Sequence, residues 1–350
     1  MKVLPLLFIL YLPNDAASQI KNAYQQTCIG FYNVENLFDC EDDPITKDDD
    51  RTPTGTSHWT EERYHKKVAN VAKVIYDFGH SISNRNTLAI LGLAEIENRY
   101  VLDAVLQDSI LAGFSYGIIH KDSPDYRGID VALLYDTSVF HPKHIQHYPL
   151  QLEDPKTHNP RTTRDQLVVT GMLADEEISV IVLHWPSRRG GQKKSEVHRL
   201  RAAKLTRHIA DSLHVRNPYA KIVIMGDLND NPSDKSVRAV LEAKKHRKET
   251  STKEFYNPMY TMFKNGQGTL AHKDQWALFD QILVSDGLLN PDYYSWSLYT
   301  AHIYSKPYLL TPRGNYKGYP FRSMVGSHFT NGYSDHLPVY IQLIRKKPNP

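Results

Sequence analysis

Cysteine is scarce in this sequence, internal repeats and low-complexity tracts are absent, and neither sign of charge dominates. The two cysteines, Cys28 and Cys40, are too few for a disulfide-stapled scaffold, and they fit either one disulfide or two buried free thiols. The composition gives no indication of a disordered chain. A formal net charge of +3 gives no basis for inferring a polyanion-binding role from total charge, so only local clusters can indicate one.

The length and hydrophobic content allow a large buried core. A chain of 350 residues with 41% hydrophobic residues can form one large domain or two small ones.

The N-terminus has the pattern of an export signal. A charged start is followed by an apolar run at residues 3–12 and by small residues at 14–18. The run is too short to cross a membrane as a helix, and no cysteine follows it before Cys28, so a lipid-anchored start is not indicated. We predict a signal peptide at residues 1–18, a short linker at 19–27, and export to a periplasm or beyond the cell.

The most informative stretch is KIVIMGDLND at residues 221–230. Four apolar residues followed by Gly226 predict a buried strand that carries Asp227 and Asn229 to the edge of a sheet. Side chains alternate along a strand, so these two are expected on one face. A carboxylate beside a carboxamide can orient a water molecule and hold a phosphoryl oxygen.

Other predicted strands also end in polar residues. The first, at residues 27–31, leads to Asn33, and the second, at 88–98, is nearly all apolar until it reaches Glu95. A carboxylate at the end of a buried strand is costly unless it is paired or metal-bound, so Glu95 is a candidate metal ligand. Further strands are predicted at residues 128–135, 167–172, 178–185 and 278–285, with another after 336.

Three helices are predicted between these strands. The first begins after Thr60 and ends at Gly79, the second spans residues 99–107, and the third spans 195–213. Many strands, few helices and short connections favour a layered α/β fold with stacked sheets over a simple βαβ repeat.

Two kinds of loop remain open to interpretation. Residues 39–50 hold seven acidic residues and one lysine, which fits a solvated loop or a structural calcium loop. Long loops are predicted at 142–164 and 295–328. The second loop interleaves aromatic and basic residues. Loops of this composition either pack on their own domain or hold a nucleic acid.

His184 closes the strand at 178–185, and a basic turn with Arg188 and Arg189 follows it. From Arg188 to His208 there are eight Lys or Arg residues against one Glu, which fits a solvated helix face or a surface that holds a phosphodiester backbone.

Asp280 is the only charge in its apolar strand. We expect it to pair with His336, because a carboxylate partner fixes the tautomer of an imidazole and raises its basicity.

Taken together, Asn33, Glu95, His184, the G-D-L-N run at 226–229, Asp280 and the S-D-H run at 334–336 resemble the endonuclease/exonuclease/phosphatase family. The resemblance implies a single domain at residues 28–346 with a tail at 347–350. The implied fold is a four-layered α/β sandwich of two mixed, mostly antiparallel β-sheets, packed face to face and flanked by helices. The implied activity is divalent-metal-dependent cleavage of phosphoester bonds.

The resemblance also implies roles for individual residues. Glu95 would be the principal ligand of Mg²⁺, or of Mn²⁺ or Ca²⁺, with Asn33 and Asp335 near the ion. Asp227 would orient or deprotonate the attacking water, and Asn229 would position the water and the phosphate. His184 and His336 would bracket the scissile phosphate, with Asp280 holding His336.

Two further assignments come from the same resemblance, and a third, Glu97, comes from its expected position on the same strand face as Glu95. Arg127 would contact phosphate and Asp125 would orient His184, although both also fit a plain turn. Glu97 would be a second metal ligand or a surface carboxylate at the strand end.

The resemblance leaves the substrate open. His184 with Arg188 and Arg189 favours an exported nuclease acting on DNA or RNA, and no protein partner or oligomer is indicated. The alternatives are a sphingomyelinase-like or phosphoinositide-type enzyme acting on a phospholipid headgroup, and a non-catalytic module that binds polyanions.

Overall fold

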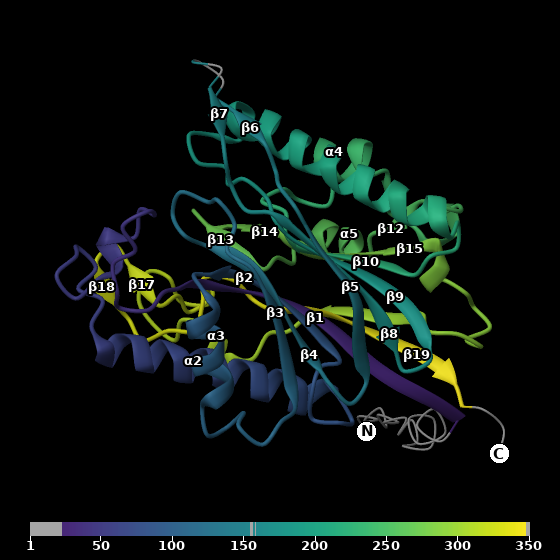
Figure 1. Cartoon of the computed structure of the whole chain (residues 1–350), viewed down its shortest axis with the longest axis horizontal. Helices are drawn as coiled ribbons and strands as arrows, with labels where there is room; N and C mark the ends of the chain where they lie inside the picture. The colour runs from purple at the N-terminus through teal and green to yellow at the C-terminus, as the bar shows by residue number, and fades with distance from the viewer. Residues whose placement is uncertain (1–22, 155–156, 158, 348–350) are drawn as a thin grey trace, which may run out of the picture.

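The computed structural model describes residues 23–154, 157 and 159–347, and two large β-sheets dominate it (Figure 1). The predicted signal peptide at residues 1–18 lies outside the described residues. No helix in the described part of the chain is long and apolar enough to cross a membrane.

The first sheet has six strands in the order β16-β19-β1-β2-β4-β3. The central strand β1 is parallel to β2 and antiparallel to β19. It begins at Tyr24, which pairs with Lys346, so residues 24–27 belong to the sheet and not to the predicted linker. The strands are β1 (Tyr24–Leu37), β2 (Ile90–Ile96), β3 (Tyr116–His120), β4 (Asp130–Asp136), β16 (Ser297–Ile303) and β19 (Val339–Lys346).

The second sheet has seven strands in the order β11-β12-β15-β10-β9-β8-β5. Its centre is β10, which is parallel to β9 and antiparallel to β15. The strands are β5 (Phe140–Tyr148), β8 (Gln166–Leu173), β9 (Glu176–His184), β10 (Ile222–Asp227), β11 (Ala243–Lys244), β12 (Phe255–Tyr256) and β15 (Asp280–Ser285).

Strands also occur where long loops were predicted. Residues 142–164 contain most of β5 and the small hairpin of β6 (Leu152–Glu153) and β7 (Pro160–Arg161). Residues 295–328 contain β16 and β17 (Met324–Val325), which pairs with β18 (His328–Phe329). The strand β5 was missed because it is a largely exposed edge strand with a proline and three histidines, so it lacks an apolar pattern.

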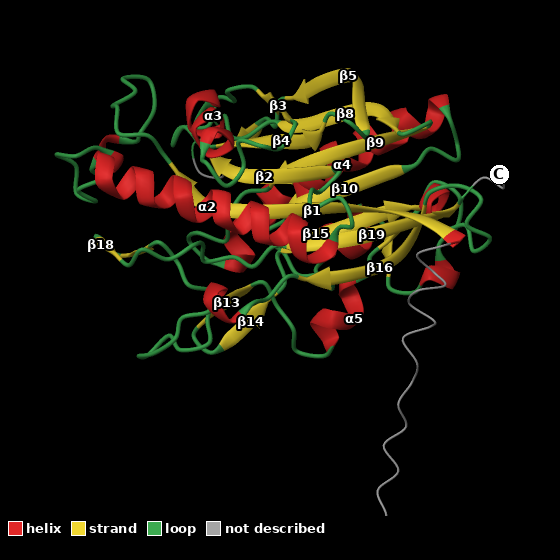
Figure 2. Ribbon diagram, turned by 90° about the horizontal axis from the view of Figure 1, so that it is seen from below, coloured by secondary structure: helices red, strands yellow, loops and turns green. Residues whose placement is uncertain are grey.

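Helices cover the outer faces of both sheets. The helices α2 (Glu61–Ile82) and α3 (Arg99–Gln107) pack on the first sheet, and α4 (Gln192–Arg216) packs on the second. Figure 2 looks onto the first sheet with α2 lying across it. A short helix, α5 (Met259–Lys264), packs near the edge of the core. The predicted four-layered sandwich of two mixed sheets is therefore confirmed.

The helix α2 continues for three residues beyond the end predicted at Gly79. Thr60 caps its start by accepting a hydrogen bond from the Arg63 amide, as expected. A Cβ atom at Gly79 would lie only 2.8 Å from the carbonyl oxygen of Asn86. The glycine thus allows close approach of the returning chain and does not end the helix.

The inner faces of the two sheets form a common apolar core. Along β1, β9 and β10, alternate residues such as Phe31, Val182 and Met225 lie in this core. The next inward-facing positions are Asn33 on β1, His184 on β9 and Asp227 on β10. On β15, the same face carries Asp280 before Ile282 and Val284. The polar residues predicted from strand ends therefore meet at one end of the sandwich.

Candidate active site

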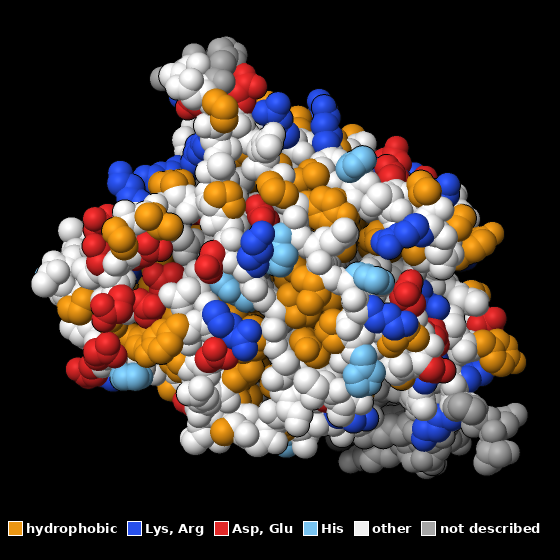
Figure 3. All heavy atoms as spheres, in the orientation of Figure 1, with side chains coloured by type: hydrophobic (Ala, Val, Ile, Leu, Met, Phe, Trp, Pro, Cys, Tyr) orange, Lys and Arg blue, Asp and Glu red, His pale blue; other side chains and the backbone are white. Residues whose placement is uncertain are grey.

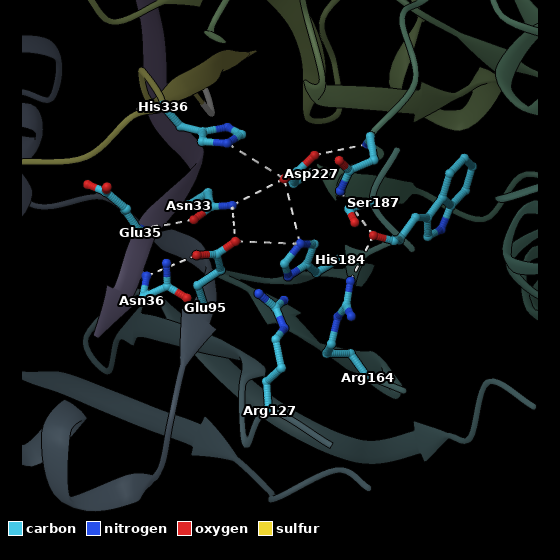
Figure 4. Close-up of polar contacts among 12 residues, drawn as sticks. Asn33, Glu35, Asn36, Glu95, Arg127, Arg164, His184, Ser187, Asp227 and His336 are labelled. Atoms are coloured by element: carbon cyan, nitrogen blue, oxygen red, sulfur yellow. Dashed lines mark hydrogen bonds and ion pairs between the residues drawn. The ribbon is translucent and has the colours of Figure 1, made fainter. Parts of the chain in front are cut away.

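Asp227 lies at the centre of the polar cluster. In the sheet it pairs with His184 on β9 and with Asp280 on β15. Its Oδ2 accepts a hydrogen bond of 3.1 Å from Nδ2 of Asn33, which comes from the other sheet. The same oxygen lies 3.7 Å from Nε2 of His184 and 3.9 Å from Nε2 of His336 (Figure 4).

The environment of Asp227 favours proton transfer near neutral pH. Burial raises the pKa of Asp227 to about 7, with His336 acting against the rise and Asp280 adding to it. A carboxyl group with such a pKa can take up a proton from water and release it again, as a general base must.

Glu95 reaches the cluster through an irregularity in β2. Leu93 faces the helices and Ala94 faces the other sheet, so simple alternation would direct Glu95 away from the site. The pairing of β2 shifts between Ala94 and Ile96, and Glu95 adopts a left-handed backbone conformation with φ of 64°. This bulge re-aims the side chain. The Oε1 atom of Glu95 accepts a 3.3 Å hydrogen bond from Asn33 and lies 3.8 Å from Nε2 of His184.

The predicted pair of Asp280 and His336 is present. The Nδ1 atom of His336 lies 2.6 Å from Oδ2 of Asp280, which also accepts a hydrogen bond from the Thr269 hydroxyl. Burial lowers the pKa of His336, but the carboxylates of Asp280 and Asp227 outweigh burial and raise it well above its ordinary value. The imidazole is therefore held as a cation facing Asp227.

His184 is held in the opposite protonation state. Burial, followed by the nearby guanidinium groups of Arg164 and Arg127, lowers the pKa of His184 well below its ordinary value. Its Nδ1 is buried and has no hydrogen-bond partner among the described residues. The site thus combines a neutral imidazole at His184 with a cationic one at His336.

Asp125 does not contact His184, contrary to the role expected for it. Its Oδ2 accepts hydrogen bonds from Arg164 (2.9 Å) and from the Thr163 hydroxyl (3.1 Å). Arg164 also donates to the carbonyl oxygen of Trp185, the residue after His184. Asp125 therefore holds Arg164, and Arg164 in turn holds the backbone next to His184. Arg164 precedes an apolar strand, and no periodicity in the sequence distinguishes it from a surface arginine.

The three arginines expected to bind substrate differ in position. Arg127 is partly exposed and points toward Glu95 and His184 (Figure 4). Arg188 is already bound to the protein: it donates to Asp230, Asp234 and the Asn229 carbonyl and lies over the Phe279 ring. Arg189 lines a groove next to the site. The assignment of Arg188 to substrate is therefore not supported.

Asn229 and Asp335 lie at the border of the cluster. Asn229 leaves the strand in a left-handed conformation, its amide donates to Asp227 Oδ1, and its side chain donates to the Trp185 carbonyl. Asp335 pairs with Arg322 at 3.0 Å and lies 3.9 Å from Nε2 of His336.

Glu97 is not in this cluster. Its carboxylate accepts a hydrogen bond from the Asp39 amide, and burial raises its pKa to about 8. Asp39 begins the acidic segment at residues 39–50, which is visible as a group of red side chains in Figure 3.

A sequence model of the Endonuclease/Exonuclease/phosphatase family matches residues 28–345. This chain belongs to the endonuclease/exonuclease/phosphatase family. No curated protein sequence matches it.

Solved structures of several proteins share the family fold with this chain. An endonuclease/exonuclease/phosphatase family protein from Bacteroides thetaiotaomicron is 15% identical, with a TM-score of 0.53 and coverage of 92% of this chain and 96% of the other. Humanized D. rerio TDP2 is 13% identical, with a TM-score of 0.52 and coverage of 91% and 98%. A mannosyl-6-phosphatase from B. thetaiotaomicron is 15% identical, with a TM-score of 0.50 and coverage of 91% and 99%. At these identities the likeness shows the fold alone.

Both cysteines of this family member are buried free thiols. Of the two possibilities that the sequence left open, the structure therefore contains the free thiols and not the disulfide.

Proposed function

We propose that this family member hydrolyses phosphodiester bonds with the help of a divalent metal ion. The observation that carries the proposal is the position of Asp227 Oδ2, within 4 Å of Nε2 of both His184 and His336. A phosphate between the two imidazoles would bring an attacking water next to this carboxylate.

The residues around the site fit a hard cation. The carboxylates of Glu95 and Asp227 share one amide group of Asn33, and such oxygen donors suit Mg²⁺, with Mn²⁺ and Ca²⁺ as alternatives. Glu95 would be the principal ligand, with Asp335 near the ion. Asn33 would orient the carboxylates, because its oxygen accepts a hydrogen bond from the Glu35 amide. When bound, the ion supplies positive charge that offsets the charge on the phosphate oxygens.

Asp227, Asp280 and His336 also bring ligand atoms within 4.8 Å of one another. Asp280 and His336 are already bonded to each other, however, and Asp280 is completely buried. We therefore place the metal on the Glu95 side of Asp227.

The protein groups have complementary tasks in this proposal. Asp227 accepts a proton from water, and the Asn229 amide holds Asp227 in position through Oδ1. The cationic imidazole of His336 donates a hydrogen bond from Nε2 to a phosphate oxygen. His184 binds the phosphate from the other side, and Arg127 adds a guanidinium suited to phosphate oxygens.

We propose nucleic acid as the substrate. The basic side chains beside His184 support this choice, and D. rerio TDP2, which has the same fold, has been solved with a single strand DNA product (12% identity, TM-score 0.51). The fold alone does not distinguish nucleic acid from other phosphoesters, since a mannosyl-6-phosphatase also has it. Export remains a proposal that rests on residues 1–18.

Hydrolysis should be measured with Mg²⁺ and with EDTA on plasmid DNA, RNA, sphingomyelin, an inositol polyphosphate, mannose 6-phosphate and bis(p-nitrophenyl) phosphate. We expect metal-dependent cleavage of nucleic acid and of bis(p-nitrophenyl) phosphate, lost in Asp227→Asn. Release of phosphocholine or inorganic phosphate, with the nucleic acid left intact, would show that the substrate is a lipid or a phosphomonoester and not nucleic acid. Inactivity on every compound would favour a binding module.

A further inference from the structure

A groove of about 430 Å³ lies beside the segment that follows His184. Its walls come from the turn before β4, the β6–β7 hairpin and the first turns of α4. Arg164 and Ser187 line the end nearest the histidine strand, and Arg127 connects this end to the catalytic cluster (Figure 4).

The lining of this groove carries excess positive charge. Arg161, Arg189 and Lys194 line it, and within the described chain none of them has an acidic partner. Asp154 is the acidic residue in the described lining, while Asp125 behind the groove is neutralised by Arg164. Lys and Arg side chains are visible beside the β6–β7 hairpin in Figure 3.

The titration of His198, which also lines the groove, is consistent with this excess. Burial lowers the pKa of His198, the positive charges of Arg161, Arg199 and Arg201 lower it further, and Asp154 opposes the fall. Arg199 is neutralised by Asp230, and Arg201 lies 3.8 Å from Glu153. Arg161, Arg189 and Lys194 therefore remain available to an anionic ligand.

An aromatic ring lies among these cations. Tyr126 is 41% exposed, and the guanidinium of Arg161 lies 5.5 Å from its ring centroid. A ring with a free face can stack on an unpaired base, and a guanidinium next to it can bind the adjoining phosphate.

We propose that this groove binds the sugar–phosphate chain of single-stranded nucleic acid on one side of the bond that is cut, with an unpaired base on Tyr126. The assignment rests on the proposed function. A substrate with one phosphate would occupy the catalytic cluster and leave Arg161, Arg189 and Lys194 without a ligand. A strand with several phosphates matches a row of cations, and an exposed ring matches a base that is not in a duplex.

The chain offers a matched control for this proposal. Lys194 lines the groove, whereas the neighbouring Lys193 is exposed but is not part of the lining. The variants Arg161→Ala and Lys194→Ala should be compared with Lys193→Ala, and Tyr126→Ala with Tyr126→Phe. The side chains of Arg161, Lys193 and Lys194 are exposed, and thermal melting will confirm that each variant is folded.

Two readouts separate the groove from the catalytic cluster. For a labelled single-stranded oligonucleotide, Arg161→Ala and Lys194→Ala should raise Kd and KM by about 5- to 10-fold and reduce the salt slope by about one. Lys193→Ala should match the wild type. Hydrolysis of bis(p-nitrophenyl) phosphate, which is too small to span the groove, should be unchanged in all of them. Tyr126→Ala should weaken binding of single strands, and Tyr126→Phe should restore it.

The possible failures are distinguishable. Wild-type affinity in Arg161→Ala and Lys194→Ala would overturn the groove assignment. Equal losses in Lys193→Ala and Lys194→Ala would also overturn it, since they would indicate only a general charge effect. Tighter binding of duplex than of single strands, unaffected by Tyr126→Ala, would overturn the single-strand assignment. Binding of oligonucleotide without hydrolysis of any phosphodiester would contradict the proposed function and leave the groove assignment standing.

Discussion

The Nδ1 atom of His336 lies 2.6 Å from Oδ2 of Asp280, and the Nε2 atom of the same ring faces Asp227 at 3.9 Å. All three side chains are buried. One carboxylate thus holds the imidazole while the other ends at the place where a water molecule would react. Because the three side chains are buried and the imidazole is hydrogen-bonded, we expect little reorganisation when a substrate binds.

Asp280→Asn should lower kcat by about 10²- to 10⁴-fold, the range for loss of one proton-handling group, with little change in KM. The substitution keeps the shape of the side chain but removes the charge that stabilises the His336 cation. Thr269→Val, which removes the hydrogen bonds of the Thr269 hydroxyl to the carboxylate and amide of Asp280 but no charge, should have a much smaller effect. Steady-state kinetics on bis(p-nitrophenyl) phosphate tests both. Near-normal kcat in Asp280→Asn would refute the role given to the pair.

Glu95→Gln should weaken Mn²⁺ or Mg²⁺ binding by at least about tenfold, because it removes a charged oxygen ligand. Glu97→Gln should leave the affinity unchanged, because Glu97 is bonded to the Asp39 amide and lies outside the cluster. Titration calorimetry and metal-induced thermal stabilisation are suitable measurements. A comparable loss in Glu97→Gln would restore Glu97 as a second ligand.

Asp125→Asn should destabilise the protein near neutral pH by about 3–5 kcal/mol, since it breaks a buried ion pair with Arg164. Burial raises the pKa of Asp125, but Arg164 and Arg127 bring it below the ordinary value of 3.8. The charged carboxylate therefore stabilises the fold above pH 3.8, and this stability is lost as pH falls through the lower folded-state pKa.

Urea denaturation from about pH 7 down to about pH 3 tests the Asp125 prediction. The difference between the wild type and Asp125→Asn should begin to shrink below pH 3.8, where Asp125 of the unfolded chain takes up a proton before the native carboxylate does. Asp211→Asn, which affects an exposed pair with Arg207, is the control and should change stability little. If the difference in the free energy of unfolding between the wild type and Asp125→Asn did not change with pH, the ion pair would be excluded as its cause.

Lys67→Met should destabilise the fold by about 3–5 kcal/mol, although lysine is usually a surface residue. Lys67 is completely buried and donates to the Ser323 hydroxyl (3.2 Å) and to the Tyr333 carbonyl (2.7 Å). Ser323 in turn donates to the buried carboxylate of Glu35. Burial lowers the pKa of Lys67 to about 8, with Glu35 and Asp335 opposing the fall. The substitution leaves both carboxylates without this cation.

A double-mutant cycle tests the Lys67 prediction. Adding Glu35→Gln to Lys67→Met should recover part of the lost stability, with a coupling of about 0.5–3 kcal/mol. The adjacent Lys66, which pairs with Glu62 on the surface, serves as the control, and Lys66→Met should have little effect. Strict additivity of the two core substitutions would show that the charges do not interact.

Much of the fold and of the candidate catalytic cluster could be predicted because strands carry strong local signals. Apolar runs that lead to Asn33, His184 and Asp227 predicted strand ends. The structure ends β9 at His184 and β10 at Asp227, whereas β1 continues past Asn33 to Leu37, and it brings all three side chains together. The pair of Asp280 and His336 was expected because each charge interrupts an apolar segment.

Other features lacked a local signal. Glu95 lies in the site only because of a bulge, and strict alternation would have turned it away. Arg188 and Arg164 are both arginines near strand ends, yet Asp230, Asp234 and Asp125 bind them internally. Which carboxylate meets which guanidinium depends on contacts between distant segments.

The sequence alone determined the central strands of both sheets, the main helices, the family resemblance and most of the polar residues at the site, because strand alternation and apolar periodicity act over a few residues. It did not reveal the edge strands. The tertiary structure decided which charged side chains are bound within the protein and which are available to a ligand. It used Arg188, Arg199 and Lys67 to neutralise buried carboxylates, set Arg127 3.8 Å from Asp125, and left Arg161, Arg189 and Lys194 along a groove. Burial of a charge requires a partner, and the partners come from elsewhere in the chain.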